Sequence, residues 1–157
     1  MIRRLMLLGA ALATFATAHA DEWLTDYKEA VTKAAEEKKP LLMNFTGTNW
    51  CPPCIQLEKR VFSQPEFKDY AAKHLVLLKL EFPPPGQTEL APPPAPMRAA
   101  KPMTPEKLRE NMLLANQYRI EGYPTLVLIS PKTKGPVRVD PTFTPKEFIR
   151  NVEKRLK

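Results

Sequence analysis

The sequence contains few residues that could bind a metal ion or a haem group. Among its 157 residues there are only two cysteines and two histidines. A structural zinc site usually takes four Cys or His ligands, and Cys51 and Cys54 with the one downstream histidine, His74, leave such a site incomplete. Covalent haem attachment needs a histidine directly after the second cysteine, where this chain has Ile55. We therefore expect no metal and no cofactor.

Long hydrophobic runs are also missing. The most apolar stretch, Leu5–Ala18, has 14 residues without a charge, whereas a membrane-spanning helix needs roughly 17–25. It follows the basic pair Arg3-Arg4 and ends in Ala18-His19-Ala20, an arrangement typical of a cleavable signal peptide. We predict that residues 1–20 are a signal peptide, with an uncleaved membrane anchor as the alternative. Export would place the protein in the periplasm or outside the cell, where a close cysteine pair can form a disulfide.

Charge of one sign is not concentrated along the chain. The formal net charge is +7, but lysine and arginine are interleaved with aspartate and glutamate. A nucleic-acid-binding protein would have a basic stripe with interleaved aromatic residues. We therefore expect a solvated surface and no nucleic-acid partner. Because nothing in the sequence indicates assembly, we expect a monomer.

Glycine is scarce and proline is abundant. The chain has five glycines and 18 prolines, and nine of the prolines lie between Pro83 and Pro105. The segment 83–104 has no hydrophobic period, so we expect it to be extended or polyproline-like. We interpret it as an insertion in a single domain that covers residues 21–157.

The rest of the chain alternates between helical and strand patterns. The predicted elements are a helix over 23–37, a strand over 41–45, a helix over 53–61, a short helix to Lys73 opened by a capping box at 63–66, a strand over 75–82, a helix over 104–118 that buries Leu108, Met112 and Ala115, strands over 125–129 and 137–139, and a last helix opened by a capping box at 144–147. This order predicts an α/β fold. Its central mixed sheet, a parallel βαβ unit followed by an antiparallel hairpin, would be flanked by helices.

Two cysteines three residues apart, in Trp50-Cys51-Pro52-Pro53-Cys54, fall at a junction of strand, loop and helix. Cys51 precedes the helix N-terminus, where free N–H groups and the helix dipole stabilise a thiolate, so we expect it to be the nucleophile. Cys54 lies one turn into the helix and can resolve a mixed disulfide. Because Pro52 and Pro53 lack N–H groups, we expect only a modest gain in the acidity of Cys51. That favours a reductant or mild exchanger over a strong oxidant, with a purely structural disulfide as the alternative.

These residues resemble the thioredoxin family. The match covers about Trp23–Lys157, with three landmarks: Phe45–Trp50 leading into the cysteine pair, Gly122-Tyr123-Pro124-Thr125 before a strand, and the terminal hairpin and helix. The run after Cys54 resembles small exported thioredoxin-like proteins and the C-terminal domain of the bacterial transmembrane thiol-disulfide interchange protein. The resemblance implies a thioredoxin fold and thiol–disulfide exchange with protein substrates that carry cysteines or disulfides. It also implies a membrane thiol–disulfide electron donor as a partner.

The resemblance further implies roles for residues around the cysteines. Trp50 is expected to flank the nucleophile at the surface, with an ordinary core position as the alternative. Pro124 is expected to follow a cis peptide bond. Its neighbours Tyr123 and Thr125 would then present backbone groups to a bound peptide, and ordinary strand residues are the alternative for both.

One departure from the family concerns proton transfer. Thioredoxins carry a buried aspartate on the strand before the cysteine pair, and the corresponding residue here is Asn44. An amide cannot accept the proton of Cys54, so another carboxylate would have to do so. Glu58, one turn past Cys54, matches a glutamate near the site of the interchange-protein domain. Glu81 shares a strand face with Lys79, which aligns with a lysine beside the family's aspartate. For Glu58 an exposed helix charge is the alternative, and for Glu81 an ordinary carboxylate without a role in proton transfer is the favoured interpretation.

Together these patterns predict an exported thiol–disulfide oxidoreductase that reduces protein disulfides. An oxidase or isomerase is the alternative within this enzyme class, because Tyr123 before Pro124 resembles protein disulfide isomerase domains. A non-catalytic binding module with a structural disulfide is the alternative from another class. We also predict that the segment 83–102 borders Cys51 and selects protein partners, with a passive insertion as the alternative.

Overall fold

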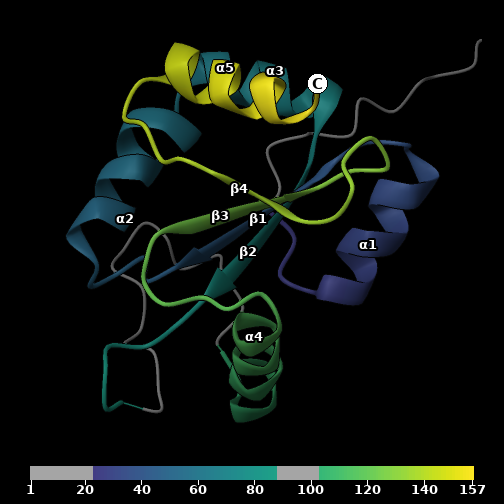
Figure 1. Cartoon of the computed structure of the whole chain (residues 1–157). Coiled ribbons are helices and arrows are strands. Elements are labelled where there is room, and N and C mark those ends of the chain that lie inside the picture. Colours follow the sequence, from purple (N-terminus) through teal and green to yellow (C-terminus); the bar gives the residue numbers. More distant parts are fainter. Residues whose placement is uncertain (1–22, 88–102) are drawn as a thin grey trace, which may run out of the picture.

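The computed structural model describes residues 23–87 and 103–157 (Figure 1). In chain order the elements are helix α1 (Tyr27–Glu36), strand β1 (Leu41–Thr46), helix α2 (Pro52–Leu57), the π-helical turn η1 (Glu58–Phe62), helix α3 (Pro65–His74), strand β2 (Val76–Glu81), helix α4 (Pro105–Gln117), strands β3 (Thr125–Ile129) and β4 (Val137–Val139), and helix α5 (Pro145–Arg155). The predicted signal peptide and most of the proline-rich segment lie outside the described residues.

Four strands form one mixed sheet in the order β2-β1-β3-β4. β1 runs parallel to β2 and antiparallel to β3, and β3 and β4 form an antiparallel hairpin. The predicted parallel unit followed by a hairpin is therefore confirmed. Because β1 and β2 are parallel, their carboxyl ends meet at one edge of the sheet, where Thr46 lies opposite Glu81. The cysteine pair follows β1 at this edge.

Helices cover both faces of the sheet (Figure 1), and a hydrophobic layer lies between the sheet and the helices on each face. On one face α2, η1, α3 and α5 enclose the first layer, which includes Leu42, Leu57, Val61, Phe67 and Phe148. On the other face α1 and α4 enclose the second layer, which includes Ala30, Met43, Phe45, Leu78 and Leu80. Side chains alternate between the faces along a strand. Since Leu42 faces the first layer, Asn44 faces the α2 side as well.

The chain before α1 pairs with the sheet instead of being helical. The sequence predicted a helix from Trp23, but α1 begins at Tyr27, after the N-cap Asp26. Leu24 forms a parallel bridge with Leu78. This bridge covers part of the free edge of β2, whose N–H and C=O groups would otherwise lack partners.

The two predicted capping boxes are wrong. Gln64, not Ser63, is the N-cap of α3, and its side chain bonds no free N–H of the helix; it donates instead to the Lys59 carbonyl at 2.8 Å. At α5 the Thr144 hydroxyl donates to the Glu147 carboxylate at 2.8 Å and makes no cap bond to the backbone. Proline occupies the first turn of both helices. Its fixed φ favours a helix start without a side-chain cap.

Helix α4 turns a different stripe toward the core than the one predicted. Thr104 caps its N-terminus as expected, and the buried residues of the helix are Leu108, Asn111 and Leu114. Met112, which was predicted to be buried, is 59% exposed. The polar residue Asn111 interrupts the hydrophobic pattern, and this is why the stripe could not be placed from apolar residues alone.

The proline-rich segment begins with a turn rather than with extended chain. The N–H of Gln87 donates to the Pro84 carbonyl at 3.0 Å, and Gly86 has a φ of 81°. Proline at the second position and a glycine with positive φ at the third are the pattern of a type II turn. The predicted placement beside Cys51 concerns mainly residues 88–102, which lie outside the described residues.

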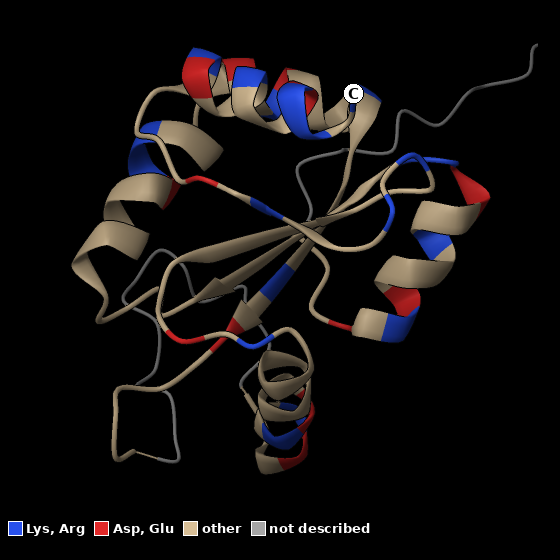
Figure 2. Cartoon of the chain, in the orientation of Figure 1, with Lys and Arg blue, Asp and Glu red and all other residues tan. Residues whose placement is uncertain are grey.

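Charged residues of both signs are interleaved along most of the helices, while the strands are mostly uncharged (Figure 2). The strands carry three charged residues, Arg138 in β4 and Lys79 and Glu81 in β2. Two of these three therefore lie toward the edge of the sheet that holds the cysteine pair. Within the part of the chain that is described, no helix has the length and apolarity to cross a membrane.

Candidate active site at the disulfide

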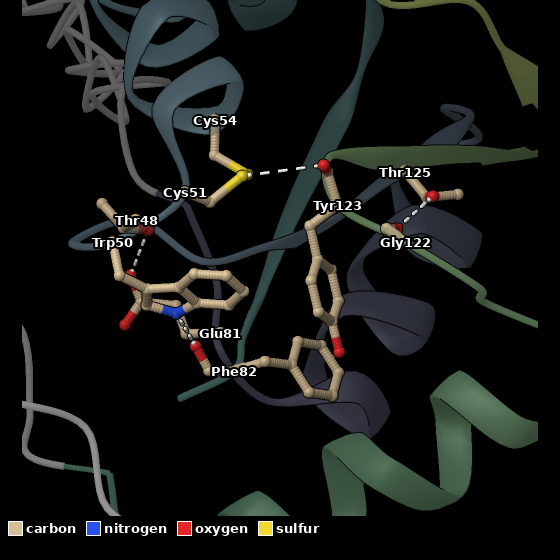
Figure 3. Close-up of a disulfide and its surroundings, with 9 residues drawn as sticks. All are labelled: Thr48, Trp50, Cys51, Cys54, Glu81, Phe82, Gly122, Tyr123 and Thr125. Carbon is tan, nitrogen blue, oxygen red and sulfur yellow. Dashed lines mark hydrogen bonds between the residues drawn. A yellow bond between two sulfur atoms is a disulfide. The ribbon is translucent and has the colours of Figure 1, made fainter. Parts of the chain in front are cut away.

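Cys51 and Cys54 form a disulfide at the start of α2 (Figure 3). Their Cα atoms are 5.3 Å apart, and the two residues are buried, with exposed fractions of 4% and 3%. Cys51 is the N-cap of α2, and its N–H donates to the Gly47 carbonyl at 2.9 Å. The sequence placed the pair between the end of a strand and the start of a helix, and the structure has it there.

Two prolines reduce the number of free N–H groups at this helix end. Pro52 and Pro53 occupy the first helical positions and carry no N–H. The N–H of Ile55 is already bonded to the Cys51 carbonyl at 3.0 Å. This leaves the N–H of Cys54 as the backbone donor of the first turn that can face the Cys51 sulfur. The helix end therefore stabilises a thiolate less than a first turn with all its N–H groups would.

The loop before β3 lies against the disulfide (Figure 3). The peptide bond between Tyr123 and Pro124 is cis, and the Tyr123 carbonyl oxygen is 3.6 Å from the Sγ atom of Cys51. The Thr125 hydroxyl donates to the Gly122 carbonyl at 2.7 Å. Of the residues predicted to bind substrate here, Tyr123 meets the sulfur through its backbone, whereas the Thr125 side chain closes its own loop.

The Trp50 ring is held beside the disulfide by two neighbours. Its indole N–H donates to the Phe82 carbonyl at 2.8 Å, and the ring meets Tyr123 edge-on, with centroids 6.0 Å apart and planes at 89°. A Cβ atom at Gly47 would lie 2.5 Å from the indole, so a larger residue there would displace the Trp50 ring. Trp50 is half-buried, which fits the predicted place at the rim of the site better than a core position.

Phe82 is a member of this site that the sequence analysis missed. Its N–H donates to the Thr46 carbonyl at 2.9 Å, and its ring stacks on Tyr123 with centroids 4.9 Å apart and planes at 24°. Burial raises the pKa of the Tyr123 phenol, so this ring stays neutral at physiological pH. The sequence does contain one indication of Phe82. This residue directly follows β2, and the carboxyl ends of the parallel strands β1 and β2 lie at the same edge of the sheet as the cysteine pair.

A cluster of three polar side chains, those of Asn44, Glu58 and Lys79, lies between the sheet and the helix that carries Cys54. Asn44 is opposite Lys79 in the parallel register of β1 and β2, so both side chains point to the α2 face. The Lys79 ammonium bonds the Glu58 carboxylate at 2.9 Å, and Glu58 lies one helical turn after Cys54. The structure therefore brings together three of the residues that the sequence singled out for proton transfer, and it pairs Lys79 with Glu58.

Two features hold Glu58 and Lys79, the charged members of this cluster, in place. Glu58 begins the π-helical turn, in which the Ser63 N–H reaches the Glu58 carbonyl at 2.9 Å; such turns are frequent at functional sites. Lys79 lies over the Trp23 ring, 5.4 Å from its centroid. The Asn44 side chain is buried, and its Oδ1 atom has no hydrogen-bond partner among the residues described.

Glu81 serves a different contact from the one considered in the sequence analysis. Its carboxylate accepts a bond of 2.6 Å from the Thr48 hydroxyl, and its backbone carbonyl accepts one of 3.1 Å from the Asn111 amide. Glu81 thus ties the loop before the cysteines to β2, which fits an ordinary carboxylate without a role in proton transfer. Within residues 23–87 and 103–157, no three side chains of His, Cys, Asp or Glu form a group that could hold a metal ion.

The topology and the Cys51–Cys54 disulfide define a thioredoxin-fold protein with a CxxC pair. Residues 22–131 match the thioredoxin-like family, and the chain belongs to this family. The predicted fold and family are confirmed.

The chain is similar to the disulfide bond reductase DsbH of Chlamydia pneumoniae, at 31% identity over 109 residues, which are 69% of this chain and 56% of the relative. A solved structure of a DsbH oxidoreductase is 27% identical, with 86% of this chain and 83% of that chain covered and a TM-score of 0.65. The oxidised DsbD C-terminal domain of Neisseria meningitidis shares the fold at 17% identity and a TM-score of 0.52, over 85% of this chain and 99% of that chain. The alignment thus spans about half the length of the curated relative.

Proposed function

We propose that this protein is an exported thiol–disulfide oxidoreductase that reduces disulfides in other proteins. The observation that carries the proposal is the Cys51–Cys54 disulfide at a helix start, with the Tyr123 carbonyl 3.6 Å from the Cys51 sulfur. Similarity to a disulfide bond reductase supports the reducing direction, and so does the shortage of N–H groups at the start of α2. The signal peptide predicted at residues 1–20 supports export.

The reaction takes two exchange steps, starting from the reduced protein. The Cys51 thiolate attacks one sulfur of a substrate disulfide, a mixed disulfide forms, and the other substrate sulfur leaves as a thiolate that takes up a proton. Cys54 then loses its proton and attacks the Cys51 sulfur, and the second substrate sulfur leaves. The substrate has gained an electron pair, and the protein holds the Cys51–Cys54 disulfide.

Glu58 is the group that we propose to accept the proton of Cys54. Residues four apart on a helix lie side by side, and the Lys79 ammonium holds the Glu58 carboxylate at 2.9 Å. Asn44 lies on the same face but is an amide and cannot take the proton. Lys79 acts through Glu58 and is a positioning residue in this scheme.

Repeated turnover needs a partner that returns electrons to the Cys51–Cys54 disulfide. We propose a membrane thiol–disulfide protein for this role, because an exported protein has no access to cytoplasmic reductants. The substrates are proteins with accessible disulfides, and the protein acts as a monomer. A mature N-terminus at Asp21, read from protein recovered from the cell envelope, would support export, whereas an intact N-terminus would favour a membrane anchor.

The roles of the two cysteines are tested by replacing each in turn. Cys51→Ser is expected to abolish the reduction of insulin disulfides, because the attacking thiolate is gone. Cys54→Ser is expected to accumulate a mixed disulfide between Cys51 and substrate, which intact-protein mass spectrometry detects. Full activity of Cys51→Ser would contradict the assignment of roles.

The direction of transfer is tested by the reduction potential of the Cys51–Cys54 couple, equilibrated against glutathione. A value near that of thioredoxin, about −270 mV, supports a reductant. A value near that of the strong oxidant DsbA, about −120 mV, would support an oxidase instead. Resistance of the disulfide to reduction, with both thiols slow to alkylate afterwards, would favour a structural disulfide.

A further inference from the structure

Three parts of the chain meet at Phe82, the residue that follows β2 (Figure 3). Its carbonyl accepts the Trp50 indole N–H at 2.8 Å, and its ring stacks on Tyr123 at 4.9 Å. The chain continues directly into Pro83 and the proline-rich segment. Phe82 therefore joins the loop before the cysteines, the loop before β3 and the start of that segment.

The two residues that Phe82 holds are the ones that flank the disulfide. Trp50 immediately precedes Cys51, and the Tyr123 carbonyl is 3.6 Å from the Cys51 sulfur. Phe82 itself is 4% exposed, so little of it is available to a substrate. Its influence on a substrate must act through the positions of Trp50 and Tyr123.

The strand end that carries Phe82 is fixed by several bonds. Its N–H is bonded to the Thr46 carbonyl at 2.9 Å. The preceding carbonyl, that of Glu81, accepts the Asn111 amide at 3.1 Å, and the Glu81 carboxylate accepts the Thr48 hydroxyl at 2.6 Å. Two successive carbonyls of this strand end are thus held by side-chain N–H groups from α4 and from the loop before Cys51.

The turn beyond Phe82 is ordered as well. Pro83 and Pro84 are half-buried, and the Gln87 N–H closes a turn onto the Pro84 carbonyl at 3.0 Å. Proline fixes its own φ, so this turn loses little further freedom when something binds to it. Pro85, at the tip of the turn, is exposed. The turn over residues 84–87 therefore gives an ordered, exposed edge that begins within three residues of the Phe82 carbonyl, to which the Trp50 indole is bonded.

We propose that Phe82 is a specificity-determining positioning residue of the disulfide site. It holds Trp50 and Tyr123 beside Cys51 and, through the turn that it leads into, adds an ordered edge against which an extended segment of a protein substrate lies. A small disulfide needs only the Cys51 sulfur, whereas a protein segment also needs these flanks. The inference rests on the proposed function and names the feature that makes protein disulfides the preferred substrates.

The test compares Phe82→Leu with a matched core variant, Phe67→Leu. Phe67 is 1% exposed and packs against the rings of Phe62 and Phe148, at 5.0 and 5.7 Å between centroids. Both variants therefore lose buried aromatic contacts, but Phe67 lies on α3, and its ring contacts with Phe62 and Phe148 involve neither Trp50 nor Tyr123. For each variant kcat/KM is measured with insulin and with hydroxyethyl disulfide as the small substrate.

Phe82→Leu is expected to lower kcat/KM for insulin by about fivefold to tenfold, mainly through KM, in keeping with the loss of one aromatic pair. For hydroxyethyl disulfide the loss of kcat/KM should be clearly smaller than for insulin, because the small substrate makes little use of the residues that flank the Cys51 sulfur. Phe67→Leu should leave the ratio of kcat/KM for insulin to kcat/KM for hydroxyethyl disulfide at the wild-type value. Equal losses on both substrates in Phe82→Leu, or no loss on either, would overturn the proposal.

A second measurement does not depend on activity. The chain has two tryptophans, so hydrogen exchange of the Trp50 indole N–H can be assigned by NMR with a Trp23→Phe variant. Phe82→Leu is expected to speed this exchange severalfold, because the strand end that carries the acceptor carbonyl loses its packing on Tyr123. An unchanged exchange rate would also overturn the proposal. If the wild-type protein reduced neither disulfide, the proposed function would fail, a result distinct from a selective loss in the variant.

Discussion

Two carboxylate–lysine pairs link helices of this protein to their neighbours, and their surroundings differ. Glu58–Lys79 joins the helix that carries Cys54 to β2 at 2.9 Å, with side chains 25% and 16% exposed. Asp26–Lys107 joins the start of α1 to α4 at 3.1 Å, with side chains 48% and 23% exposed. Lys107 also bonds Glu110. The same chemical groups are thus largely enclosed beside a disulfide in one pair and open to solvent in the other.

The difference shows that location decides what such a pair can do. An exposed ion pair contributes about 0.2–1 kcal/mol and is screened by salt. A largely buried pair costs more to break, because the group left behind has lost both its water and its partner. We infer that Asp26–Lys107 positions a helix, while Glu58–Lys79 positions a carboxylate for chemistry at Cys54.

The comparison between the two pairs is sharpened most by placing a second carboxylate next to the half-buried Glu58–Lys79 pair. Asn44 is 2% exposed and lies opposite Lys79 in the sheet. Asn44→Asp is expected to lower the free energy of unfolding by about 2 kcal/mol, because a buried carboxylate is poorly compensated. It is also expected to add an ionisation to the pH–rate profile of mixed-disulfide resolution, since aspartate can accept the Cys54 proton. Urea unfolding at pH 7 and stopped-flow kinetics measure the two effects.

Asn111→Asp is the matched control for this variant. Asn111 is also 2% exposed and also has an Oδ1 atom without a partner in the described part of the chain, but it lies on α4, on the other face of the sheet. It should lose similar stability and gain no ionisation in the exchange reaction. A new ionisation in both variants, or in neither, would contradict the placement of Asn44 on the proton path.

A smaller effect is expected from neutralising the half-buried Glu58 carboxylate itself. Glu58→Gln keeps the shape of the side chain but removes its proton acceptor, so mixed-disulfide resolution should slow by about threefold to tenfold, at the low end of general-base effects because Glu58 is partly solvated. Lys79→Met should slow the same step less, since it removes only the positioning partner. A pH–rate profile unchanged in Glu58→Gln would make Glu58 a structural carboxylate.

The sequence predicted the strands well because their apolar runs are short and sharply bounded. The predicted strand over 125–129 and the one over 137–139 have the bounds of β3 and β4. Helix starts were less predictable. The helical spacing of apolar residues extends back to Trp23, but backbone pairing of Leu24 with Leu78 at the sheet edge prevails there.

Partners across the fold could not be predicted, because they depend on register and helix placement. The sequence grouped Lys79 with Glu81, since both lie on one strand face, but that pattern cannot tell which helix packs there. The structure brings Glu58 to Lys79 and leaves Glu81 to Thr48. Phe82 was overlooked for the same reason: its contacts with Trp50 and Tyr123 join segments that are far apart in the chain.

The smallest effect is expected at the exposed pair. A backbone bond from the Glu29 N–H, and then Lys107, lower the pKa of Asp26 from its ordinary value of 3.8. A carboxyl with a lower pKa in the folded protein adds stability that is fully present above the unfolded pKa and is lost as the pH falls through the folded pKa. Asp26→Asn keeps a good N-cap but removes the charge.

Asp26→Asn should therefore cost less than about 1 kcal/mol of unfolding free energy at pH 7, since the pair is solvated and screened. The difference from the wild-type protein should shrink as the pH falls below 3.8, the ordinary value for Asp26, and chemical unfolding between pH 2 and 7 measures it. Disulfide exchange should keep its wild-type rate. A difference that persists at low pH would mean that Asp26 acts through its shape rather than its charge, and a slower exchange would remove the distinction between the two pairs.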